Sequence, residues 1–413
     1  MSYEGKSNIP VLRFPQFRLN WEEKALSYFM TFKNGINADK EQYGHGRKFI
    51  NVLDVIADRP ILHEQIIGSV NVSDAEFAKN EVKYGDILFQ RSSETREEVG
   101  QSNVYLDKDL AATFGGFVIR GRPHVAFNPR YFDLLLKTEA VRKEITTRSG
   151  GSTRYNVSQD TLAAVKVVLT QDATEQSKVA LFFDSIDKKI NKLRHKHQLL
   201  ETYKRGLMQK IFSQQIRFKQ DDGSEFEDWK DRKLKSLGEF RGGGTPATNN
   251  KEYWNGDIPW VSSSDLSDGK VHKISMTRFI TQEAINESAT KIIPANSILI
   301  VSRVGIGKLA VCKQEVCTSQ DFSNFTPTKD NVCFLSFLLK SKTSQLLSLA
   351  QGTSIKGFTN NELANLRVEL PSPQEQKKIA DCLSAFDKKV DAVANQISQL
   401  ESFKQGLLQQ MFV

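Results

Sequence analysis

A stretch of 38 residues occurs twice in this chain, and the repeat limits the possible folds more than any other feature of the sequence. The first copy runs from Glu175 to Phe212 and the second from Glu375 to Phe412, at a constant offset of 200 residues. Fourteen of the 38 aligned positions are identical. A period this long indicates two copies of one large unit, each ending in the same segment.

Within both copies, apolar residues recur at alternating steps of three and four, the spacing of a helix that packs along another helix. The positions expected to pair the helices are Ile186, Ile190, Leu193, Leu200 and Leu207 in the first copy, and Phe386, Val390, Val393, Leu400 and Leu407 in the second. The only polar seam positions shared by both copies are Lys204 and Lys404, where we expect the adjacent Tyr203 and Phe403 to take over the contact.

The length of the repeated segment favours a pair of helices. A helix of about 35 residues measures about 52 Å, which is more than one domain of this size needs. Packing of each helix within its own domain is the alternative. We expect an antiparallel pair related by a pseudo-two-fold axis, with one domain at each end, because parallel helices would crowd both domains at one end.

The segments outside the helices are similar at their edges and diverge in the middle. Residues 21–26 resemble residues 229–234, and residues 162–169 resemble residues 363–370. Alternating segments bounded by Gly, Pro, Asn and Ser predict strands, with short helices at 140–145 and 334–349. The predicted fold class is α+β, with a strand-rich domain at 1–173, a long helix at 174–213, a second strand-rich domain at 214–372 and a long helix at 373–413.

The net charge of +8 favours a polyanionic partner, but the charge is unevenly distributed. Residues 175–212 hold nine Lys and Arg against four Asp and Glu, whereas residues 1–174 hold 23 against 22. Binding of nucleic acid therefore requires basic groups that gather on one face. The four cysteines form no CxxC pair, and we find neither a leader peptide nor an apolar run of about 18 residues. We expect a soluble, cytoplasmic protein without a metal site.

Several catalytic motifs fail on inspection. His63-Glu64 is followed by Ile67 where a zinc-binding helix needs its second histidine. The run from Gly305 to Lys308 lacks the upstream glycine and the following Ser or Thr of a phosphate-binding loop. Glu81-Val-Lys83 is not preceded by a nearby Pro-Asp pair, as a nuclease would require. We therefore predict no catalytic residue in this chain.

Polar loops rich in small residues and cations are the candidates for contacts with DNA, because they bring donors to phosphates and base edges. In the first domain these residues are Lys33, Arg47, Lys48, Arg91, Arg96, Arg120, Arg122 and Arg154. In the second domain they are Arg241, Thr245, Ser263, Ser264, Arg303, Lys308, Ser354 and Lys356. A solvated surface charge is the alternative for each of them.

The sequence resembles the specificity subunit of type I restriction-modification enzymes over nearly its whole length. The resemblance rests on Leu370-Pro-Ser-Pro-Gln-Glu-Gln376, on the helix ends at Lys404 to Phe412 and Lys204 to Phe212, on Leu12-Arg-Phe-Pro15 with Trp21, and on residues 242–266. The first domain departs from the family pattern at Lys33-Asn-Gly-Ile36 and at Asp172-Ala-Thr174.

The resemblance implies that each domain is a target recognition domain that reads one half of an asymmetric bipartite DNA sequence. It implies that the helices set the spacer and bind two methyltransferase subunits, which use S-adenosylmethionine to modify an adenine in each half. Cleavage would reside in separate motor-nuclease subunits. The alternatives are a duplicated coiled-coil scaffold without DNA recognition, and a nuclease or methyltransferase with an unrecognised site.

Overall fold

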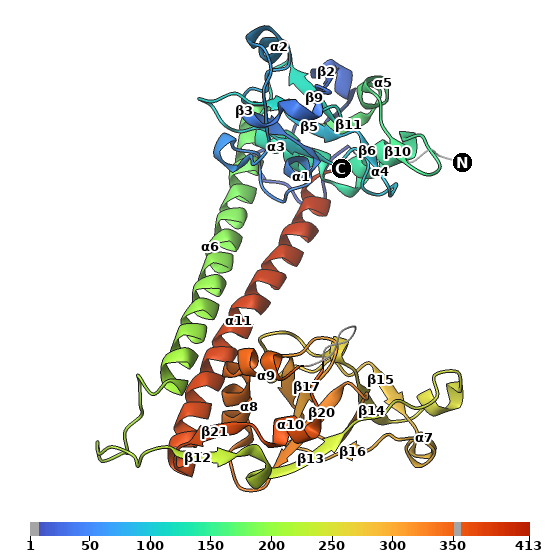
Figure 1. The fold of residues 1–413 in the computed structure, drawn as a ribbon. Coiled ribbons are helices and arrows are strands. Elements are labelled where there is room, and N and C mark those ends of the chain that lie inside the picture. The colour runs from blue at the N-terminus through green and yellow to red at the C-terminus, as the bar shows by residue number, and fades with distance from the viewer. Residues whose placement is uncertain (1–7, 351–356) are drawn as a thin grey trace. The chain divides into compact units, whose positions relative to one another are not determined.

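The computed structural model describes residues 8–350 and 357–413. The chain forms two compact units, the first comprising residues up to 192 with residues 396–413, and the second comprising residues 193–395. Each unit holds one strand-rich domain and about half of each long helix, α6 (Ala173–Phe212) and α11 (Pro373–Met411) (Figure 1).

The first domain is built on a four-stranded sheet with the order β2-β9-β5-β7. Its strands are β2 (Met30–Asn34), β5 (Ile87–Gln90), β7 (Ser102–Val104) and β9 (Val118–Pro123). Successive side chains of a strand point to opposite faces, and β5 shows this: Ile87 and Phe89 enter one core, whereas Leu88 enters another. A smaller sheet joins β4 (Ser69–Val70), β3 (Tyr43–Ile50) and β8 (Thr113–Phe114).

The second domain repeats this construction. Its first sheet has the order β13-β20-β17-β18, formed by β13 (Gly238–Gly242), β20 (Phe322–Pro327), β17 (Ile298–Val301) and β18 (Leu309–Val311). The second sheet joins β15 (Arg278–Ile280), β14 (Ile258–Val261), β19 (Val316–Thr318) and β16 (Ile292–Ile293). Strand β17 again divides its side chains between two cores, with Ile298 and Ile300 in one and Leu299 and Val301 in the other.

The segments whose sequences are similar in the two copies pair with each other in space. β1 (Glu22–Ala25) is antiparallel to β11 (Lys166–Leu169), and β12 (Lys230–Lys233) is antiparallel to β21 (Arg367–Leu370). These pairs place the beginning and the end of each domain beside a long helix. The divergent segments predicted to carry specificity lie between them in the sequence.

Short helices and strands complete both domains. They are α1 (Val52–Val55), α2 (Asp74–Lys79), α3 (Pro129–Leu136), α4 (Glu139–Arg148), α5 (Gln159–Ala163), β6 (Ser92–Ser93) and β10 (Tyr155–Asn156) in the first, and α7 (Gln282–Asn286), α8 (Val332–Ser341), α9 (Thr343–Leu349) and α10 (Asn360–Ala364) in the second. Single-turn 3-10 helices lie at Leu26–Tyr28, Lys40–Gln42, His63–Gln65, Leu234–Ser236, Lys251–Trp254 and Ser263–Asp265. The single helix predicted at 334–349 is wrong, because the chain breaks at Lys342 into α8 and α9.

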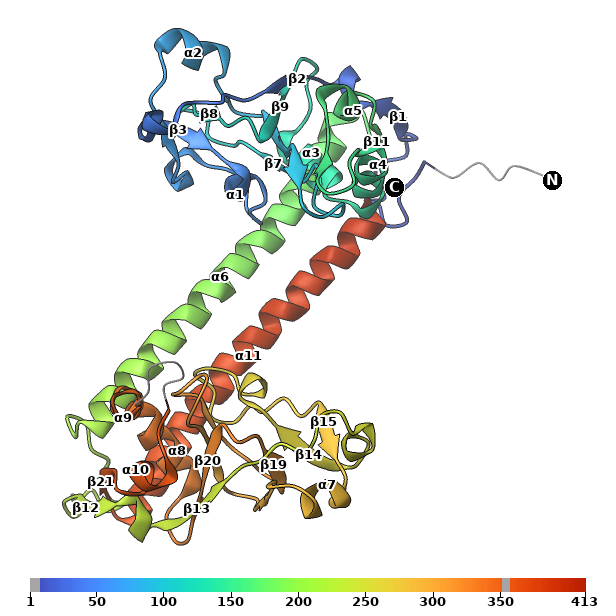
Figure 2. The same ribbon diagram turned by 45° about the vertical axis from the view of Figure 1, so that its right-hand side comes forward.

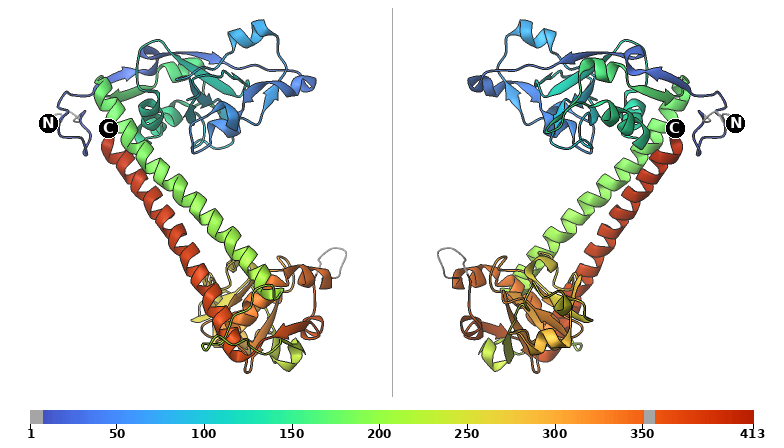
Figure 3. Two further views of the ribbon diagram at one scale, coloured as in Figure 1. Left: turned by 90° about the vertical axis from the view of Figure 1, so that its left-hand side faces the viewer. Right: turned by 90° about the vertical axis from the view of Figure 1, so that its right-hand side faces the viewer.

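The two long helices run antiparallel within each unit, as predicted (Figures 2 and 3). In the first unit, Ile186 and Ile190 of α6 share a core with Leu400 and Leu407 of α11. In the second unit, the Tyr203 ring lies 5.3 Å from the Phe386 ring. The remaining predicted pairing residues are buried or half-buried: Val390 and Val393 are buried, and Leu193, Leu200 and Leu207 are half-buried.

Tyr203 and Phe403 do not replace the lysines in the helix seam, although the Tyr203 ring contacts Phe386 at the edge of the seam. These rings are 60% and 55% exposed, whereas Lys204 is only 8% exposed. Lys204 stays in the seam because Asp387 of the facing helix accepts a hydrogen bond from its ammonium. A buried cation is tolerated when an opposite charge lies beside it.

An Arg–Glu pair anchors the start of each long helix. Arg13 donates to both carboxylate oxygens of Glu175 at 2.6 and 2.8 Å, and Arg217 donates to those of Glu375 at 3.3 and 2.8 Å. Both glutamates are buried. The hydrogen bond to each glutamate raises the pKa of its arginine, so the residues that precede each domain are tied to the helix that follows it.

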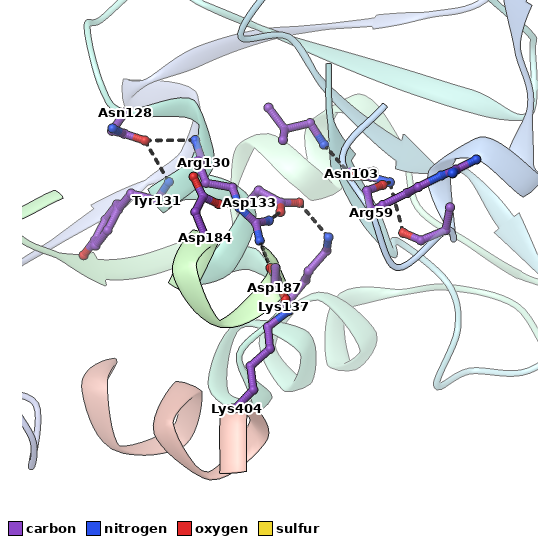
Figure 4. Close-up of polar contacts among 12 residues, drawn as sticks. Arg59, Asn103, Asn128, Arg130, Tyr131, Asp133, Lys137, Asp184, Asp187 and Lys404 are labelled. Atoms are coloured by element: carbon purple, nitrogen blue, oxygen red, sulfur yellow. Dashed lines mark hydrogen bonds and ion pairs between the residues drawn. The ribbon is translucent and has the colours of Figure 1, made fainter. Parts of the chain in front are cut away.

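The first unit holds an ion network that has no counterpart among the described residues of the second unit. Figure 4 shows Arg130 of α3 reaching Asp133 on its own helix and two carboxylates of α6, Asp184 and Asp187. Arg130 is 7% exposed, and these carboxylates raise its pKa against the effect of burial. Asn128 begins α3 in this unit as Asn331 begins α8 in the second, so the residue in the place of Arg130 is Cys333.

Candidate nucleic-acid interface

Four turns meet at one edge of the first domain, and we call them the first turn edge. They are residues 35–37 after β2, 51–54 after β3, 91–93 after β5 and 115–117 before β9. Backbone hydrogen bonds join them: Ile36 N donates to Phe114 O at 2.9 Å, Gly115 N to Ile50 O at 3.0 Å, and Arg91 N to Phe117 O at 2.9 Å. The turns therefore form one fixed surface.

The same bonds recur in the second domain, at residues 243–245, 262–265, 302–304 and 319–321, which we call the second turn edge. Gly244 N donates to Thr318 O at 2.8 Å, Ser319 N to Val261 O at 2.9 Å, and Ser302 N to Asp321 O at 2.7 Å. The backbone is thus repeated while the side chains differ. This register aligns Arg91 with Ser302, so Arg303 lies one residue further along its turn than Arg91 does.

A reciprocal cap fixes one turn of each edge. Asn51 N donates to Asp54 Oδ2 at 2.9 Å, and Ser262 N donates to Asp265 Oδ2 at 2.7 Å. Such a cap satisfies backbone donors that would otherwise lack partners. Each capping pair encloses one exposed residue: Leu53 is 74% exposed in the first edge, and Ser264 is exposed in the second.

Close packing explains the glycines of these turns. A Cβ on Gly35 would lie 2.2 Å from Gly115 O, and a Cβ on Gly243 would lie 2.0 Å from Ser319 O. These glycines let two turns of the same edge approach each other. Within the run Gly242-Gly-Gly244, Gly243 therefore serves to assemble the edge.

The second turn edge brings together four of the residues predicted to contact DNA, namely Thr245, Ser263, Ser264 and Arg303, and a fifth, Lys308, lies beside it. The Thr245 hydroxyl donates to Gln320 Oε1, and Lys308 Nζ donates to Ser263 O at 3.4 Å. Arg303 is exposed. Hydroxyl groups and cations lie together here, which is the combination that contacts phosphates and base edges.

Arg278 joins this edge although no sequence signal indicated it. Its guanidinium lies 4.6 Å from the centre of the Trp260 ring and donates to Ser262 Oγ and Asp265 Oδ2. It stands in a short strand without neighbouring glycine or serine. Only the pairing of β15 with β14 places it beside the cap.

In the first domain, only Arg91 of the predicted set lies in the turn edge, where its guanidinium donates to Gly116 O at 3.2 Å. Three other predicted side chains hold loops of the domain together. Lys33 Nζ donates to Lys79 O at 2.7 Å, Lys48 Nζ to Ile66 O at 2.6 Å, and Arg96 Nε to Thr146 O at 3.0 Å. Burial lowers the pKa of Lys33.

Two arginines of β9 are also engaged within the domain. Arg120 is 6% exposed and donates to Glu81 O, and its pKa is lowered first by burial and then by the adjacent Arg122. Arg122 donates to both oxygens of Asp86 at 3.0 and 2.7 Å, and this pairing raises its pKa. In the second domain, a hydroxyl pair, Ser297 and Thr326 at 2.7 Å, takes the corresponding place.

The remaining predicted residues lie apart from the turn edges or outside the described chain. Arg47 pairs with Asp74 at 3.0 Å and lies over the Phe77 ring. Arg154 is exposed in the loop before β10, and Arg241 donates weakly to Ile292 O at 3.4 Å. Ser354 and Lys356 lie outside the described residues.

Neither a metal centre nor a membrane span is seen in the part of the chain that the structure describes. Within residues 8–350 and 357–413, no three His, Cys, Asp or Glu side chains gather as metal ligands would. In the same ranges, no helix is long and apolar enough to cross a bilayer.

Comparison with protein families matches residues 226–402 to the type I restriction modification DNA specificity domain. Two relatives align with about half of the chain. The type I restriction enzyme MjaIX specificity subunit of Methanocaldococcus jannaschii is 37% identical over 208 residues, 49% of this chain and 48% of its own length. The EcoR124I/EcoR124II specificity subunit of Escherichia coli is 34% identical over 174 residues, 40% of this chain and 42% of its own length.

Alignments over nearly the full length extend the likeness. The putative type I restriction enzyme MjaX specificity subunit of Methanocaldococcus jannaschii is 23% identical over 406 residues, 94% of this chain and 92% of its own length. The solved type I S subunit from M. genitalium superposes with a TM-score of 0.56 at 14% identity, covering 98% of this chain and 99% of its own. The last comparison shows a shared fold.

Proposed function

We propose that this chain, which is similar to type I restriction-modification specificity subunits, reads an asymmetric, bipartite DNA sequence. The observation that carries the proposal is the pair of turn edges. Their backbone hydrogen bonds repeat while their side chains differ. Two readers with one framework and unlike contact groups fit a target with two unlike halves.

The chemistry of the second turn edge supports contact with DNA. Arg303 and Lys308 supply cations for phosphates, while Ser264 and Thr245 supply hydroxyl groups for bases or sugars. The first edge has fewer cations and more apolar surface, with Leu53 and Phe117 exposed at 74% and 64%. An apolar side chain can contact the methyl group of thymine, so the two edges are suited to different base pairs.

The long helices are the proposed platform for partner proteins. Their exposed apolar residues include Leu181 and Leu199 of α6 and Phe403 of α11, at 69%, 55% and 55% exposure. We propose that two methyltransferase subunits bind the helices, that they carry S-adenosylmethionine, and that motor-nuclease subunits complete the assembly. This chain then contributes recognition without catalysis, in the cytoplasm.

A binding experiment with the assembled complex tests this function. The chain is purified with its methyltransferase partner, and binding to duplex DNA is measured at several salt concentrations. We expect a sequence-selective complex whose affinity falls steeply as salt rises, because counterions are released from the phosphates. Equal affinity for all duplexes would favour a scaffold without DNA recognition, and methylation or cleavage by this chain alone would contradict the non-catalytic role.

A further inference from the structure

Gln320 is the exposed central residue of the turn between β19 and β20. Both of its neighbours are fixed: Ser319 N donates to Val261 O at 2.9 Å, and Asp321 O accepts from Ser302 N at 2.7 Å. The Thr245 hydroxyl donates to Gln320 Oε1 from the adjacent turn. The side-chain amide of Gln320 is therefore oriented before any ligand binds, because the neighbouring backbone and the amide oxygen are both hydrogen-bonded.

The contact with Thr245 leaves part of the amide available. An amide side chain has two N–H donors and an oxygen with two lone pairs, and Thr245 uses one lone pair. The described residues supply no hydrogen bond to Gln320 Nε2. A donor and an acceptor thus remain side by side, which matches the N7 acceptor and N6 donor that adenine presents in the major groove.

Charged groups beside Gln320 suit the flanking phosphates. Arg303 is exposed, and its backbone N donates to Asp321 O at 3.3 Å, next to Gln320 in sequence. Lys308 lies against Ser263 of the adjacent capped turn. Phosphate contacts fix register and orientation, whereas the base contact carries the sequence information.

In the first turn edge, an amide side chain reaches the same place from the adjacent turn, which follows β2. The shared register aligns Gly116 with Gln320 and Asn37 with Thr245. A Cβ on Gly116 would lie 1.8 Å from Asn37 Oδ1, so the Asn37 amide lies over the position that a side chain at 116 would take. The exposed Asn37 is the amide of this edge.

We infer that Gln320 and Asn37 are specificity-determining residues whose amides take the same place in the two edges, each reading the adenine of one A·T base pair in its own half-site. The inference rests on the proposed function and adds the base and the side chain that recognises it. Thr245 is a positioning residue, since it acts through Gln320. Because the Thr245 hydroxyl donates to the amide oxygen, the N–H groups of Gln320 stay available to a base.

The test maps methylated sites in DNA exposed to the complete complex carrying wild-type chain, Gln320→Ala or Asn37→Ala. Gln320→Ala should relax one A·T position to several bases in one half-site and weaken binding to the original site about 5- to 150-fold, the range of one bidentate contact. Asn37→Ala should relax one position in the other half-site only. Thr245→Val should relax the same position as Gln320→Ala, to a smaller extent.

A matched control is Gln314→Ala, because Gln314 is exposed at the opposite end of β19. It should leave both half-sites unchanged. An unchanged motif with Gln320→Ala, or relaxation in both half-sites, would overturn the inference while the proposed function stands. Failure of the wild-type complex to select any sequence would overturn the proposed function itself. Melting of each complex, followed by circular dichroism, identifies variants that fail to fold.

Discussion

Lys404 Nζ of α11 lies 2.5 Å from Asp187 Oδ1 of α6, and the same pair recurs in the other unit between Lys204 and Asp387. The repeat arises because both copies of the helix carry both residues, 200 positions apart. In an antiparallel pair, each lysine then faces the aspartate of the other copy. A charged residue in an apolar seam favours the register in which it meets its partner, so these two pairs specify how the helices align.

We predict that removing one partner of the Lys204–Asp387 pair destabilises the second unit, whereas replacing both partners by apolar residues restores much of the stability. Lys204→Met leaves Asp387, whose side chain is only 14% exposed, without its cation. The free energy of unfolding of the second unit should fall by about 1–3 kcal/mol. The double variant Lys204→Met with Asp387→Leu should recover at least half of this loss in urea unfolding, and a double variant less stable than Lys204→Met would contradict the account.

Removing Arg130 should destabilise the first unit more strongly. Arg130→Met leaves Asp133, which is fully buried, near Asp184 and Asp187 with one cation fewer. The expected loss is about 3–5 kcal/mol, the magnitude found when a buried ion pair loses one partner. Hydrogen exchange of α3 amides measures it.

Arg148→Met is the matched control, because Arg148 forms an exposed pair with Glu144 one helical turn away. Its loss should stay within about 0.5 kcal/mol. Equal effects of the two substitutions would show that the Arg130 network contributes no more than a surface ion pair.

His272 should make the second unit sensitive to mild acid. Burial lowers its pKa below the ordinary 6.5, and its ring lies 3.3 Å from Ser384 Oγ and 5.7 Å from the Phe337 ring. The unfolded chain therefore binds a proton at a higher pH than the folded chain. Stability should be full above pH 6.5 and should decline as the pH falls through 6.5 towards the folded-state pKa.

Urea unfolding at pH 7.5 and pH 5.5 checks this dependence, with α8 as the reporter. His272→Gln should reduce the difference between the two midpoints. His45→Gln, at an exposed position of β3, should leave it unchanged. A second unit more stable at pH 5.5 than at pH 7.5 would refute the assigned sign.

Gly243 should tolerate no side chain. A Cβ there would lie 2.0 Å from Ser319 O and 2.4 Å from Thr318 Oγ1, so Gly243→Ala should separate two turns of the second edge. We expect a loss of at least about 1–3 kcal/mol, as for other overpacked sites, together with weaker DNA binding. Gly206→Ala is the control: nothing lies within 4 Å of its Cβ on α6, and it should raise stability by about 0.5–1 kcal/mol.

The helices and the repeat were predictable, because seam spacing and internal similarity are local in sequence. The antiparallel direction also followed from the duplicated order of domain and helix. The pairing of Lys204 with Asp387 was missed, since a lysine in a seam gives no sign of the partner that faces it. A break at Lys342 was missed as well, because apolar residues on both sides of the polar run 340–345 were assigned to one helix.

The candidate site was harder to predict than the fold. Cations near glycines marked Arg303 and Lys308, which the structure places together. The same criterion also selected Arg120 and Arg122, whose guanidinium groups hold the Glu81 loop instead. Arg278 and Gln320 escaped notice because strand pairing and turn packing between distant residues bring them to the edge.

The central claim is that each domain reads its own half of one bipartite target. The most direct measurement exchanges residues 214–371 for those of another family member and maps methylated adenines across a genome, with the methyltransferase partner present. We predict that one half of the motif changes while the other half remains the same. A change in both halves, or in neither, would contradict independent reading by the two domains.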